Sequence, residues 1–141
     1  MKIAIANDHG GQPLKPHIIQ ELTQQGHQLI NLGTDTHDSV DYPSYATAVT
    51  EAILQGQADA GLLICGTGVG MSIAANRKSG IRAALCYDLF TAQASRDHND
   101  ANILVLGARV TDPALATQIT KIFFSTPFSQ EPRHIRRISL I

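Results

Sequence analysis

The chain has 141 residues, of which 43% are hydrophobic and 16% charged, and its formal net charge is −1. This length suits one domain that buries about two-thirds of the surface of its unfolded chain. No apolar run approaches the ~20 residues that a membrane span needs, and no secretion signal precedes the first apolar run. Two cysteines form neither a disulfide framework nor a zinc cluster. We therefore expect a cytoplasmic protein that binds neither membranes nor nucleic acid.

The net charge hides an uneven distribution of charge along the chain. Residues 1–76 carry two basic and seven acidic side chains, whereas residues 77–141 carry nine basic and five acidic ones. A basic half of this kind is either a solvated face or a surface that binds a small anionic molecule.

Short apolar runs alternate with amphipathic stripes along the whole chain. Strands are predicted at residues 3–6, 29–30, 60–65, 81–86 and 103–106. Helices are predicted around Leu14–Leu22 and Ala46–Ile53, after the glycines at 66–70, at 88–96, and around Leu115–Ile122. Pro13 and Pro16 then belong in the first turn of the first helix, and Asp112-Pro113 begins the last clear helix as N-cap and N1.

This alternation predicts an α/β fold. Residues 1–141 should form a single-domain, three-layer αβα sandwich with a five-stranded parallel, Rossmann-like sheet and helices on both faces. Because ligands of such sheets bind beyond the carboxyl ends of the strands, the site is expected among the loops that follow the strands. These loops are residues 7–11, 65–70, 86–88 and 107–109.

The segment Gly66-Thr67-Gly68-Val69-Gly70 places three glycines directly before a predicted helix. Its backbone N–H groups and the positive end of the helix dipole favour an anion or developing negative charge. Dinucleotide-binding and cysteine-phosphatase loops are excluded because each needs a different residue at Met71. A P-loop is excluded because no Gly-Lys-Ser/Thr ending occurs, and a receiver domain because its aspartate is replaced by Cys65.

Cys65 ends the third predicted strand beside these backbone donors. A helix N-terminus stabilises a thiolate, so Cys65 is a candidate nucleophile or base. The alternative is a buried structural cysteine, which is the usual state of a free thiol. For Cys86, which no such loop follows, the structural interpretation is preferred.

Three further polar clusters have both a structural and a functional interpretation. Asp8, before His9, either caps the following helix or faces the site. His98-Asn99-Asp100 is either a polar turn or part of a site; because it lies at the amino end of the sheet, His98 could serve Cys65 only from a second subunit. Arg133 and Arg137, at i and i+4, form either a solvated helix face or, with Arg109, a phosphate clamp.

Several motifs occur in one order along the chain. They are Asp8-His9, Asp41-Tyr42-Pro43, the block Cys-Gly-Thr-Gly-Val-Gly-Met-Ser-Ile-Ala-Ala-Asn at 65–76, His98-Asn99-Asp100-Ala-Asn102 and Gly107-Ala-Arg109-Val. Together they resemble the type B ribose-5-phosphate isomerase family, from the first strand through Arg137. Galactose-6-phosphate isomerase subunits share the glycine block but generally lack the His-Asn-Asp motif. One branch of the family uses a glutamate at the position of Met71, so this sequence resembles the cysteine branch.

The resemblance implies an aldose–ketose isomerase that interconverts ribose 5-phosphate and ribulose 5-phosphate through an enediolate, without a metal or organic cofactor. It implies that Cys65 is the base and that the segment Gly66, Thr67, Gly68, Val69 and Gly70 holds the enediolate oxygen. Asp8 and His98, with Thr67 as a helper, match the residues that open the sugar ring.

The resemblance also implies roles for the substrate-binding residues and for the assembly. The sugar hydroxyls would be contacted by His9, Tyr42 and Asn99, and the phosphate by Arg109, Arg133 and Arg137, with His9 or His134 nearby. Family members are dimers or tetramers with shared sites, so His98, Asn99 and Arg109 are expected from the neighbouring subunit. The basic segment 129–141 would complete the phosphate site or the dimer interface. Two alternatives stay open, an isomerase of a six-carbon sugar phosphate (allose or galactose 6-phosphate) and a non-catalytic phosphosugar-binding protein.

Overall fold

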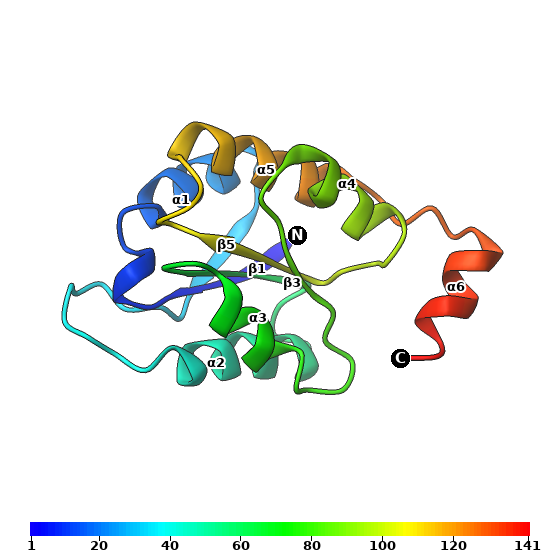
Figure 1. Ribbon diagram of the computed structural model, residues 1–141, viewed down its shortest axis with the longest axis horizontal. Coiled ribbons are helices and arrows are strands. Elements are labelled where there is room, and N and C mark those ends of the chain that lie inside the picture. The colour runs from blue at the N-terminus through cyan, green and yellow to red at the C-terminus, as the bar shows by residue number, and fades with distance from the viewer.

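The computed structural model describes residues 1–141 and contains one five-stranded sheet between two layers of helices (Figure 1). The strands are β1 (Lys2–Asn7), β2 (Gln28–Asn31), β3 (Ala60–Cys65), β4 (Ala83–Leu85) and β5 (Ile103–Gly107). The helices are η1 (His9–Gly11, a 3₁₀ turn), α1 (Lys15–Gln24), α2 (Tyr42–Leu54), α3 (Val69–Ala75), α4 (Leu89–Asp97), α5 (Pro113–Ser125) and α6 (Pro132–Ile138). The strand order is β2-β1-β3-β5-β4, and all neighbours are parallel. The predicted fold class is confirmed.

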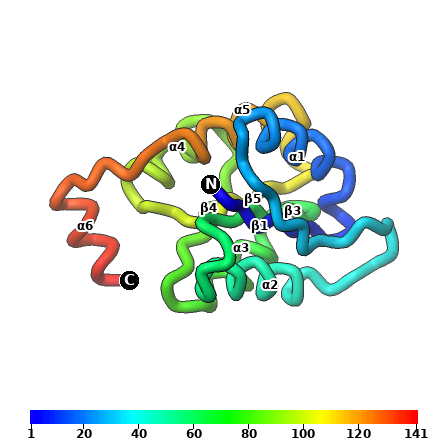
Figure 2. Tube along the Cα trace, turned by 180° about the vertical axis from the view of Figure 1, so that it is seen from behind, coloured from blue at the N-terminus to red at the C-terminus, as the bar shows by residue number.

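Both faces of the sheet are buried, which explains the uninterrupted apolar runs of its strands. One face, with Ile5, Leu62 and Leu104, packs against α1, α4 and α5. The other face, with Leu63 and Val105, packs against α2 and α3. The same two layers are visible from behind in Figure 2. None of the helices combines the length and the apolar character that crossing a membrane requires.

The local predictions are confirmed in part. Asp112 caps α5 by accepting a hydrogen bond from the N–H of Leu115, with an O···N distance of 3.0 Å. Pro16 lies in the first turn of α1, but Pro13 precedes the helix. The predicted strand at 81–86 shrinks to Ala83–Leu85, and before its start the side chain of Asn102 takes the backbone N–H of Arg82 at 2.8 Å.

The chain places β2 on one side of β1 and the later strands β3, β5 and β4 on the other side, so the strand order reverses at β1. The loops after β1 and β3 therefore leave the sheet side by side, and the N–H of Asp8 donates to the carbonyl of Ile64 at 3.2 Å. Such a switch point is where open parallel sheets bind ligands.

The last helix, α6, does not cover the sheet. Figures 1 and 2 show it projecting beyond the sandwich, past the end of α4. Residues 126–141, which follow α5 and include α6, therefore form a C-terminal arm.

Candidate active site

The loop after β3 folds its own backbone around the thiol of Cys65. The side chain is only 5% exposed, and its Sγ accepts a hydrogen bond from the N–H of Gly68 at 3.2 Å. Gly68 has φ of +82°, and a Cβ there would collide with Leu85. Only glycine fits this position without strain. The loop is therefore built so that a backbone donor meets the sulfur.

Other backbone donors of this loop remain free. The N–H groups of Gly66, Thr67 and Gly70 make no hydrogen bond within the chain, whereas that of Val69 contacts Thr67 Oγ1 at 3.4 Å. Helix α3 begins at Val69, so the end of the predicted turn is already helical. Free N–H groups at the start of a helix favour a negatively charged oxygen.

Asp8 fulfils its structural interpretation and still lies at the candidate site. Its Oδ1 accepts a hydrogen bond from the N–H of Gly11 at 3.0 Å, which caps the 3₁₀ turn. A Cβ on Gly10 would lie 3.3 Å from this oxygen and 3.0 Å from the nitrogen of Gly66. The Asp8 turn therefore packs directly against the glycine loop. The cap orients the carboxylate without exhausting its acceptor capacity.

The His9 ring is fixed in one tautomer by the loop before α2. Its Nδ1 lies 3.2 Å from the backbone nitrogen of Val40, whose N–H can only donate. In neutral His9 the proton consequently lies on Nε2. The second ring nitrogen is thus available to donate a hydrogen bond.

Two tyrosines border the glycine loop. A Cβ on Gly70 would lie 2.6 Å from Cζ of Tyr42, so this ring packs on the loop from the start of α2. Tyr87, in the loop after β4, donates its hydroxyl to the carbonyl of Thr67 at 3.0 Å. Sequence reasoning missed Tyr87, although the loop 86–88 was among the expected places.

Arg109 also reaches this edge of the sheet from within the same chain. Its N–H donates to the carbonyl of Gly66 at 2.8 Å, and a Cβ on Gly66 would lie 3.2 Å from its Cζ. One chain therefore brings Arg109 to its own glycine loop without help from a neighbouring subunit. Because β5 lies directly beside β3, the loops that follow these two strands meet.

The remaining predicted residues lie at the opposite end of the sheet. His98 is the C-cap of α4, which begins just after the carboxyl end of β4, so about 13 Å of helix separates it from that edge. Asn99 follows it and is exposed. Arg133 and Arg137 are exposed on α6, where Arg133 pairs with Glu131 at 2.7 Å. Within one chain, these residues do not meet Cys65.

His98 and His134 join the arm to the end of α4. Their rings stack with centroids 4.5 Å apart and planes at 13°. His134 is buried and its Nε2 has no hydrogen-bond partner. Burial lowers the pKa of His134, the neighbouring His98, Arg133 and Arg137 lower it further, and Glu131 raises it.

Both cysteines are free, and their surroundings differ. Cys86 is buried beside Ser95, and burial raises its thiol pKa to about 11. The structural interpretation of Cys86 is thus confirmed. No group of three His, Cys, Asp or Glu side chains is close enough together to hold a metal ion.

The sequence profile described as Ribose/Galactose Isomerase matches residues 3–141. The chain belongs to this isomerase family. It is 49% identical to the putative sugar phosphate isomerase YwlF of Bacillus subtilis, with all of this chain and 95% of the relative covered. It is 44% identical to ribose-5-phosphate isomerase B of Escherichia coli, with 99% of this chain and 93% of that protein covered.

The fold agrees equally well with solved members of the isomerase family. The structure of a ribose 5-phosphate isomerase from Thermotoga maritima superimposes with a TM-score of 0.95 at 50% identity. The match covers 99% of this chain and 95% of that one.

The lowered pKa of His134 predicts a loss of stability in acid. The unfolded chain takes up a proton at this residue more readily than the folded protein, so the free energy of unfolding should fall as the pH drops below about 6.5. His134→Phe keeps a stacked ring without this titration and should show a smaller fall between pH 7.5 and 5.5 in urea unfolding. The exposed His17→Phe control should keep the wild-type slope. An unchanged slope in His134→Phe would contradict the assignment.

Proposed function

We propose that this chain interconverts ribose 5-phosphate and ribulose 5-phosphate through an enediolate, with Cys65 as the base and no metal or organic cofactor. The observation that carries the proposal is the cysteine sulfur at the switch point, hydrogen-bonded to Gly68 N–H and bordered by free backbone donors. Relatives of this chain are named ribose-5-phosphate isomerase, and this supports a five-carbon substrate over a six-carbon one.

The isomerisation needs a base that removes a proton from C2 of the open aldose and returns it to C1. A thiolate at Cys65 suits this task because it lies at the end of a rigid strand. The negative charge that develops on the substrate oxygen would meet the N–H groups of the segment 66–70, which are fixed before the reaction begins. Base and donors from one loop move the proton and stabilise the enediolate together.

The sugar ring must open before this proton transfer, which requires an acid and a base at the ring oxygen and the anomeric hydroxyl. Asp8 packs against the glycine loop, Thr67 lies within it, and both are suited to one side of this step. We assign the other side to His98 of a second subunit, because the His98 of the same chain lies at the far end of α4. Tyr42, His9 and Asn99 would contact the sugar hydroxyls.

Phosphate binding would likewise draw on two chains. Arg109 lies beside its own glycine loop, and His9 offers Nε2–H nearby. Arg133 and Arg137 on the projecting α6 would come from the partner, as arginine side chains suited to bidentate contacts with phosphate.

A homo-oligomer, at least a dimer, explains features that a lone chain leaves unpaired. Ile73 on α3 is 63% exposed, and Phe90 at the start of α4 is 76% exposed. A cavity of about 630 Å³ also opens between the arm and the segment before β4, with Lys78, Arg82 and Ile138 in its lining. These surfaces are suited to a second copy of the chain, with segment 129–141 crossing between subunits.

The proposed chemistry needs a reduced Cys65. Both cysteines are free, which suits a reducing compartment, and we therefore place the enzyme in the cytoplasm.

Cys65→Ala should lower kcat for ribose 5-phosphate by about 10²- to 10⁴-fold, because it removes the proposed base. Binding of ribose 5-phosphate, measured by calorimetry, should persist. The matched control Cys86→Ala removes a buried thiol elsewhere and should keep wild-type activity. Substantial residual turnover in Cys65→Ala would refute the base assignment.

His98→Asn should slow ring opening. We expect kcat for ribose 5-phosphate to fall by about 10²-fold, because one proton-transfer group is lost. Turnover of 4-deoxyribose 5-phosphate, which lacks the hydroxyl that closes the ring, should stay near the wild-type value, and the exposed His17→Asn control should change neither rate. An equal loss with both substrates would rule out a role confined to ring opening.

A further inference from the structure

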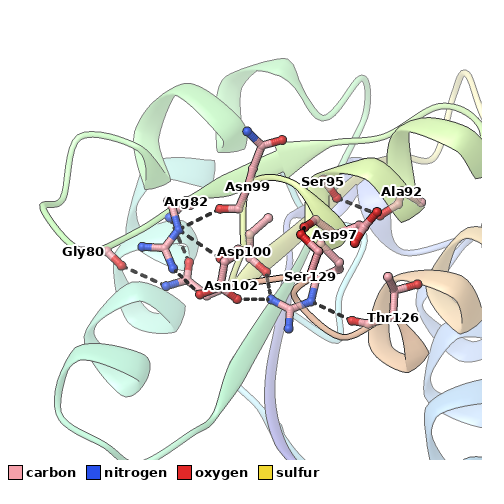
Figure 3. Close-up of polar contacts among 12 residues, drawn as sticks. Gly80, Arg82, Ala92, Ser95, Asp97, Asn99, Asp100, Asn102, Thr126 and Ser129 are labelled. Atoms are coloured by element: carbon pink, nitrogen blue, oxygen red, sulfur yellow. Dashed lines mark hydrogen bonds and ion pairs between the residues drawn. The ribbon is translucent and has the colours of Figure 1, made fainter. Parts of the chain in front are cut away.

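The turn that carries His98 and Asn99 ends in an aspartate with an unusual backbone. Asp100 has φ of +45°, a left-handed conformation that few residues other than glycine adopt. Such a conformation persists only where the surrounding contacts hold it. Figure 3 shows the contacts that surround it.

Arg82 holds the turn from the segment before β4. Its Nη2 contacts Asp100 Oδ2 at 3.0 Å, while its Nε donates to the carbonyls of Asn99 and Asp100, each at 3.0 Å. The side chain of Asn102 completes this side, with its Oδ1 accepting from Arg82 N–H and its Nδ2 donating to Gly80 (Figure 3). One guanidinium therefore binds both the carboxylate and the backbone of the turn.

Arg96, one turn earlier on α4, holds the other carboxylate oxygen. Its Nη1 lies 3.1 Å from Asp100 Oδ1 and also donates to the carbonyl of Ala101. Its Nε reaches the carbonyl of Thr126, at the end of α5, at 3.4 Å. The same guanidinium thus links the turn to the start of the C-terminal arm.

Contacts of two further residues fasten the arm to this turn. Ser129 donates its N–H, at 3.1 Å, and its hydroxyl, at 2.7 Å, to the carbonyl of Asp97. His134 on α6 stacks on His98 itself. The turn and the arm are consequently tied together at Thr126, Ser129 and His134.

The burial of these charges argues for positioning over simple stabilisation. The side chains of Arg82, Arg96 and Asp100 are 26%, 21% and 37% exposed, so they are neither freely solvated nor fully buried. Ion pairs of this kind add little net stability, because desolvation offsets much of the attraction. The two arginines bind the two oxygens of one carboxylate, and these paired contacts fix the orientation of the turn.

We propose that Asp100, gripped by Arg82 and Arg96, is a positioning residue that sets His98, Asn99 and the base of the C-terminal arm as one unit. This unit delivers the ring-opening group and the arginines of α6 to the partner's pocket in a fixed mutual arrangement. The proposal rests on the roles given above to His98, Arg133 and Arg137.

Asp100→Asn is the direct test, because asparagine tolerates the left-handed backbone but lacks the charge. We expect kcat for ribose 5-phosphate to fall about 10- to 100-fold through misplacement of His98. For 4-deoxyribose 5-phosphate kcat should stay near wild type, whereas KM should rise for both substrates because the arm is loosened. Asp59→Asn is the matched control: it removes a carboxylate that accepts from Lys2 N–H at 2.7 Å, and it should change neither constant.

Amide hydrogen exchange supplies a readout that does not depend on activity. In Asp100→Asn the amides of Ala101 and Ser129, bonded to the carbonyls of Ser95 and Asp97, should exchange faster, while those of β3 stay protected. Arg96→Lys, which keeps the charge but not the fork, should show the same pattern more weakly and serves if Asp100→Asn does not fold.

Unchanged exchange at Ser129, or a loss of kcat no greater than in Asp59→Asn, would overturn the positioning role. An equal loss of kcat with both substrates would also overturn it. If the activity assays of wild-type protein or of His98→Asn contradict the proposed function, the exchange data still decide whether Asp100 couples the turn to the arm.

Discussion

The common direction of the five parallel strands is the constraint on which the rest of the structure depends. Every strand ends at the same edge, so the loops carrying Asp8, Cys65 and Arg109 meet there. The return helices carry the chain back, so the turn after α4 lies at the other edge with His98. No rearrangement of side chains within one chain closes this gap, and a site that uses both groups needs two chains.

At the carboxyl edge, glycines decide the geometry. A left-handed Gly68 aims its N–H at the sulfur of Cys65, and Gly10 and Gly70 allow the Asp8 turn and the Tyr42 ring to approach the same loop. Side chains at these positions would push the neighbouring groups apart. At the amino edge the geometry depends on charged side chains instead. Two guanidinium groups bind the carboxylate of Asp100, and one of them also contacts the start of the arm.

Much of the fold and part of the site could be predicted from the sequence. The apolar runs and the cap at Asp112 sufficed for the sandwich, and the glycine motif sufficed to locate Cys65. The position of Arg109 required the strand order, because only the pairing of β3 with β5 places it beside Gly66. The Arg82 contact with Asp100 and the Val40 contact of His9 join residues 18 and 31 positions apart, and no local pattern encodes such pairings.

The central claim, that each pocket joins the glycine loop of one chain to His98 of another, can be tested by mixing two inactive variants. Cys65→Ala and His98→Asn protein, dissociated together and allowed to reassociate, would form hybrid dimers in which one pocket carries both native residues. The account predicts that activity returns to about a quarter of the wild-type value, since half the dimers are hybrids with one intact site of two. A mixture that stays as inactive as its components would show that each site lies within a single chain.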